Sequence, residues 1–75
     1  MKKEILDALH LVRSVTTPHF AVYVEDFIAE FSSAILLSEE LKKESFDILS
    51  AACYTSTPKS AEYFRAVIRK YDQEA

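Results

Sequence analysis

The segment KKEILDALHLVRSVTTPHFAVYVEDFI, residues 2–28, is followed 40 positions later by a second version of itself, KKESFDILSAACYTSTPKSAEYFRAVI, residues 42–68. Ten of the 35 residue pairs at this offset are identical without a gap, where average residue usage gives about two by chance. Some identities are charged, such as Asp7 and Asp47, and a shared need for amphipathic helices does not require them. We therefore favour an internal duplication over the alternative, which is convergence of two amphipathic segments.

The first copy predicts two helices separated by a Thr-Pro pair. Apolar residues recur at helical spacing from Lys2 to about Ser14. Thr17 then reads as an N-cap, and Pro18 follows at the first helical position, where its missing N–H group costs nothing. A second helix therefore begins at Pro18, with an apolar face that continues to about Ile35.

The second copy predicts another two helices. Ser38 is a plausible N-cap for a helix from about Glu39 to Tyr54, with acidic residues near the positive end of the helix dipole. Thr57 and Pro58 repeat the cap of the first copy and begin the last helix, which we expect to end in a frayed DQEA segment at residues 72–75.

Each copy is thus predicted to be a helical hairpin that cannot cover its own apolar face, whereas two copies can cover each other. Solenoids need about three or more such units. We therefore expect an all-α fold, a compact four-helix domain built from two duplicated antiparallel helical hairpins. It is a single domain, residues 1–75, with repeat units of about 1–37 and 38–75. The predicted core consists of Leu9, Val12, Phe20, Val24, Phe27, Phe31, Leu49, Ala52, Phe64, Val67 and Ile68.

The composition limits the function classes. The chain has 75 residues, 49% of them hydrophobic, with no glycine and one cysteine, Cys53. A domain of this size buries only about 60% of its unfolded surface, so partners can contribute to its stability. A lone cysteine gives no reason to expect an oxidising compartment, and no apolar run approaches the ~20 residues of a membrane span. We expect a cytoplasmic protein that does not associate with a membrane.

Candidate catalytic and metal-binding residues are few. His10, His19 and Cys53 do not have the short ligand spacings of a zinc site. Cys53 lies in an apolar segment, which favours a buried structural thiol over a nucleophile. Asp26 and Glu30 lie four residues apart on one helical face, but flanking serines favour a solvated surface over acid–base chemistry. We expect no enzymatic activity, no metal and no cofactor.

The charge distribution, and apolar residues that lie outside the main apolar face of each helix, favour a binding surface over a catalytic site. The net charge is −3, and the second helix is acidic where its counterpart, the fourth helix, is basic. Opposite charge on the two helices favours their pairing, either within one chain or between two subunits. Apolar residues also fall at the edges of the stripes or on polar faces. The predicted partner-binding residues are Leu6, Val22, Glu25, Ala29, Glu30, Phe46, Arg65, Arg69 and Lys70.

These features predict a small regulatory or interaction module of the adaptor or inhibitor type, which binds a partner protein through a helical surface. Homodimerisation is expected as well, because one self-complementary patch is enough to form a symmetric dimer. The alternative is a nucleic-acid-associated regulator that uses the basic face of the fourth helix, with cations on phosphates and tyrosine rings on bases.

Overall fold

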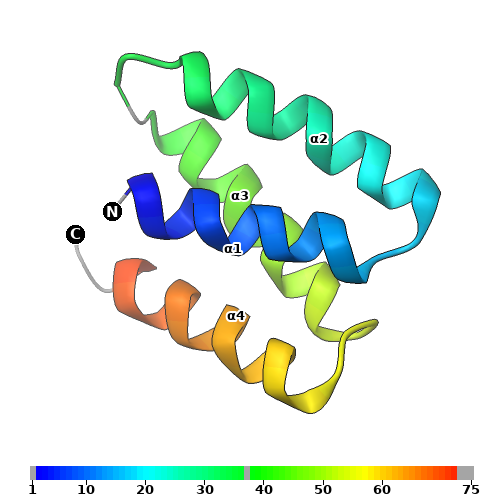
Figure 1. The fold of residues 1–75 in the computed structure, drawn as a ribbon. Helices are drawn as coiled ribbons and strands as arrows, with labels where there is room; N and C mark the ends of the chain where they lie inside the picture. The colour runs from blue at the N-terminus through cyan, green and yellow to red at the C-terminus, as the bar shows by residue number, and fades with distance from the viewer. Residues whose placement is uncertain (1, 37, 73–75) are drawn as a thin grey trace.

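The chain folds into four helices, α1 (Lys2–Val15), α2 (Pro18–Ser33), α3 (Glu39–Cys53) and α4 (Pro58–Asp72). Figure 1 shows them in a computed structural model that describes residues 2–36 and 38–72. No strand occurs in these two ranges, so the predicted all-α class is confirmed. Beyond Asp72, the segment predicted to fray lies outside the described residues.

The predicted caps lie at the helix starts. Thr17 has extended backbone angles (φ −67°, ψ 155°), and Pro18 follows as the first helical residue of α2. The Ser38 hydroxyl accepts a hydrogen bond from the Leu41 N–H group at 3.1 Å and so caps α3. The Ser60 N–H group donates to Thr57 Oγ1 at 3.4 Å at the start of α4. The Ser38 and Thr57 side chains thus compensate backbone donors that have no partner within the helix, whereas the Thr17 side chain makes no capping hydrogen bond.

α1 lies at the centre of the arrangement. It packs against all three other helices, and α3 also packs against α4. In Figure 1, α2 and α4 lie on opposite sides of α1, and α3 crosses behind it. The acidic helix and the basic helix of one chain are therefore separated by α1, although their charges favour contact.

The core is formed by the inward faces of all four helices. It comprises the fourteen residues Ile5, Ala8, Leu9, Val12, Val24, Phe27, Ile28, Phe31, Ile48, Leu49, Ala52, Phe64, Val67 and Tyr71. Nine of the eleven predicted core residues belong to it. Phe20 and Ile68 are only partly buried, because they pack against the edge of this cluster.

The apolar face of α2 is shorter than its sequence predicts. The helix ends at Ser33, and Ala34 adopts extended angles (φ −71°, ψ 129°). Ile35, expected at the end of the apolar stripe, is instead 96% exposed in the connection to α3. Periodicity continues past the point where the helix leaves the core.

Candidate functional site

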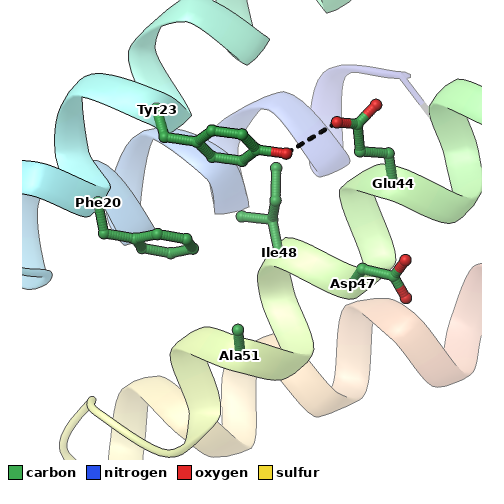
Figure 2. Close-up of a pocket in the computed structure, with 6 residues that line it drawn as sticks. All are labelled: Phe20, Tyr23, Glu44, Asp47, Ile48 and Ala51. Atoms are coloured by element: carbon green, nitrogen blue, oxygen red, sulfur yellow. Dashed lines mark hydrogen bonds between the residues drawn. The ribbon is translucent and has the colours of Figure 1, made fainter.

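An open groove runs between α2 and α3. Phe20 and Tyr23 line it from α2, and Glu44, Asp47, Ile48 and Ala51 line it from α3, around a volume of about 380 Å³. In Figure 2 the rings of Phe20 and Tyr23 extend from one helix toward the other, and Ile48 points up between the helices. We refer to the space lined by these six residues as the α2–α3 groove.

The groove continues into a smaller apolar hollow at one end. This hollow, of about 160 Å³, is lined by Thr16, Thr17, Phe20, Ala51 and Thr55. Phe20 and Ala51 line both spaces, so the two are adjacent. The surface thus combines one end that carries carboxylates with one end that is almost entirely apolar.

Two aromatic rings form the α2 wall of the groove. The ring centroids of Phe20 and Tyr23 are 5.9 Å apart and their planes differ by 13°, a stacked arrangement. Tyr23 remains 48% exposed. Partly exposed aromatic rings supply much contact area at a small entropic cost, which is why they are enriched in protein interfaces.

Negative charge collects around the Tyr23 hydroxyl. This hydroxyl donates a hydrogen bond to Glu44 Oε1 at 2.9 Å (Figure 2). The hydrogen bond raises the pKa of Tyr23, and burial and the charges of Glu44, Asp47 and Glu30 raise it further. Three carboxylates therefore act on one point of the groove, and the bond to Tyr23 holds one of them in place.

A corresponding arrangement occurs between α4 and α1. Tyr63 lies 40 positions after Tyr23, and burial and the charges of Asp7 and Glu4 raise its pKa. Here a cation is present, because Lys70 Nζ lies 2.9 and 3.2 Å from the two carboxylate oxygens of Glu4. This contact raises the pKa of Lys70 and lowers that of Glu4.

The residues predicted to bind a partner do not form a single surface. Val22, 60% exposed, and Ala29 are exposed on α2, whereas Arg65 and Arg69 are exposed on α4, and α1 lies between these two helices. Glu25 is exposed on α2 as well.

Three of the predicted residues contribute to packing or pairing within the chain. Leu6 and Phe46 are partly buried against the core. Lys70 is engaged by Glu4. Glu30 is the member of the predicted set whose charge reaches the α2–α3 groove.

The predicted partner-binding residues include none of the groove-lining residues Phe20, Tyr23, Glu44, Asp47, Ile48 and Ala51. A signal was present in the comparison of the two copies, because Glu30 and Ala51 stand where the other copy has Lys70 and Leu11. The charge is reversed at one of these positions, and the side chain is shortened at the other.

The remaining candidates for chemistry lie elsewhere. Cys53 is partly buried, and its thiol donates to the Ala61 carbonyl oxygen at 3.6 Å. Within residues 2–36 and 38–72, no three His, Cys, Asp or Glu side chains are placed to hold a metal ion. In the same ranges, none of the helices is long and apolar enough to cross a membrane.

Comparison with models of protein families, with curated proteins and with solved structures found no match. What the chain does is therefore inferred from its own geometry.

Proposed function

We propose that this chain is a small cytoplasmic interaction or regulatory module, of the adaptor or inhibitor type and without enzymatic activity, which binds a partner protein in the α2–α3 groove. The observation that carries the proposal is the stacked pair Phe20 and Tyr23 on the wall of an open groove. Aromatic anchors of this kind account for a large share of binding energy in protein interfaces.

The fold proposed with this function is a duplicated pair of antiparallel helical hairpins, with repeat units of about 1–37 and 38–75. Two facts support it. α2 and α4 begin at prolines 40 positions apart. Core positions also recur at this spacing, as in Leu9 and Leu49 or Val24 and Phe64. In a duplicated fold, each surface of one hairpin has a counterpart on the other, so differences between counterparts indicate specialisation.

The nucleic-acid alternative, binding through α4, has less support. Lys70 is paired with Glu4, which offsets one of the four basic charges of that helix. Tyr71 is 3% exposed and so offers no face on which a base can stack. Lys59, Arg65 and Arg69 remain exposed, but three cations on a net acidic protein make a small electrostatic footprint.

Self-association is proposed as a second property of the same module. Because α1 lies between α2 and α4, a contact between α2 of one copy and α4 of another joins two different surfaces. Such a head-to-tail contact closes into a dimer only if α2 and α4 of each copy both face the other copy. A dimer is better served by one self-complementary patch, and the exposed Val22 and Ala29 on α2 are suited to it.

Site-specific photocrosslinking tests the proposed groove. A photoreactive amino acid replaces Ala51, which lines the groove, and in a separate variant it replaces Ala66, an exposed alanine of α4. We expect a discrete protein partner to be captured from position 51 and not from position 66. Capture from position 51 should be lost in a Tyr23→Ser background that remains helical by circular dichroism. Equal capture at both positions, or none at position 51, would refute a docking role for the groove.

A further inference from the structure

The α2–α3 groove and the corresponding surface between α4 and α1 share a tyrosine and two acidic residues but differ in charge and in the size of several side chains. Between α4 and α1, Lys70 binds the Glu4 carboxylate, and Leu11 packs against the core. In the groove, the residues 40 positions away are Glu30 and Ala51.

The differences in side-chain size run both ways, because Phe20 and Ile48 stand where the other copy has the smaller Ser60 and Ala8. Glu30 brings a third negative charge toward Tyr23, where Lys70 brings a positive charge to the other surface. Ala51 lines the groove with a single methyl group, where Leu11 supplies a branched side chain. The α2–α3 groove has open volume together with negative charge; α2 carries no lysine or arginine, and α3 carries Lys42 and Lys43.

We infer that the segment which occupies this groove is a basic amphipathic helix of a different protein, an inference that rests on the proposed binding role of the groove. One Lys or Arg of this helix takes the position relative to Glu44 that Lys70 takes relative to Glu4. An apolar residue one turn away covers Phe20 and Ala51 in the adjoining hollow.

The spacing of the groove supports a helical segment. The rings of Phe20, at the apolar end, and Tyr23, beside the carboxylates, are 5.9 Å apart. Side chains three or four positions apart on a helix are separated by about 5–6 Å, so one helix face presents a cation and an apolar group at matching distance. Apolar anchors on one helix face are a recurring mode of recognition in hydrophobic grooves.

The other occupants fit the groove less well. Nucleic acid is repelled, because its phosphates would face Glu30, Glu44 and Asp47. A second copy would have to offer the exposed Arg65 and Arg69, which lie across α1 from the groove. That contact is head-to-tail, which gives a ring only if the rotation between copies closes and otherwise an open chain.

Two synthetic peptides test the inference on the full chain. Both are Ala-rich helices of about 20 residues, long enough for stable helicity in water. The basic peptide carries Lys and Leu four positions apart, and the matched acidic peptide carries Glu in place of Lys. Binding is followed by backbone amide NMR shifts of the ¹⁵N-labelled protein during titration.

We expect the basic peptide to shift the amides of Tyr23, Glu44, Asp47 and Ala51 and the acidic peptide to leave them unchanged. Glu30→Lys supplies the cation from within the chain and should weaken binding of the basic peptide roughly tenfold. Glu25→Lys is the matched control, because it makes the same change in net charge on α2 at an exposed residue that is not one of the three whose charges act on Tyr23. It should change the affinity by less than about twofold.

Any of three results with the peptides would overturn the inference. They are equal shifts with both peptides, equal effects of the two lysine variants, and no groove shifts with the basic peptide at millimolar concentration. Groove shifts that grow with the concentration of the protein alone would assign the groove to a second copy and overturn it too. If a partner is still captured from position 51 in any of these cases, the proposed function stands and only the basic helix is refuted.

Discussion

Truncation of the buried Phe27 side chain, compared with truncation of Phe20, distinguishes the role of the core in stability from that of the groove in binding. The Phe27 side chain is almost fully buried, and its ring centroid lies 5.8 Å from that of Phe31. Replacing a buried phenylalanine with alanine costs about 3–5 kcal/mol in lost burial and cavity formation. A chain of 75 residues has a total stability of roughly 4–11 kcal/mol. Phe27→Ala should therefore remove a large part of the free energy of unfolding.

Phe20→Ala is the matched control, because the same ring lies partly exposed at the edge of the core. It should cost about 1–2 kcal/mol and reduce binding in the groove. Urea unfolding followed by far-UV circular dichroism measures both variants. In thermal melts, Phe27→Ala should lower Tm by about 12–40 °C. Equal destabilisation by the two variants, or a loss below about 1 kcal/mol for Phe27→Ala, would show that the core is assigned wrongly.

Three further predictions concern single groups. Glu44→Gln should lower the pKa of Tyr23 toward its ordinary value and leave that of Tyr63 unchanged, as followed by NMR titration of the phenol carbons; an unchanged Tyr23 would contradict the hydrogen bond between them. Because the pKa of Glu4 is lowered in the folded chain, its carboxylate stabilises the fold at neutral pH, and this stabilisation is lost as the pH falls through the lowered pKa. The unfolding free energies of the parent and of Glu4→Gln should therefore converge in acid, below pH 4.5. In sedimentation equilibrium the parent should exceed its 8.6 kDa monomer mass and Val22→Glu should not; a monomeric parent at several hundred micromolar would argue against the dimer.

The four helices could be predicted from the sequence because their start signals are local. Thr17 with Pro18 and the Ser38 cap act within one turn, and apolar periodicity identifies the buried face. The end of α2 is less predictable, because neither glycine nor proline marks it. Ile35 therefore continues the pattern in sequence while the chain has already left the core.

The groove could not be predicted from periodicity, because its parts come from two helices. Tyr23 and Glu44 are 21 positions apart, and only the placement of α2 against α3 brings them to 2.9 Å. Periodicity places Tyr23 on the apolar side of its helix but does not show how closely the next helix approaches. For the same reason, the partly buried Leu6 and Phe46 could not be told from exposed contact residues.

The comparison of the two copies carries more information about the site than either copy alone. On the proposed duplication, both surfaces began with the same tyrosine and the same pair of acidic residues, which both copies still have. In the surface between α4 and α1, Lys70 forms an exposed ion pair with Glu4, and Leu11 packs against the core. On this proposal, the groove differs from its counterpart at Glu30 and Ala51 while the core positions are shared. A duplicated domain can in this way keep one interface for folding and use its counterpart for a partner.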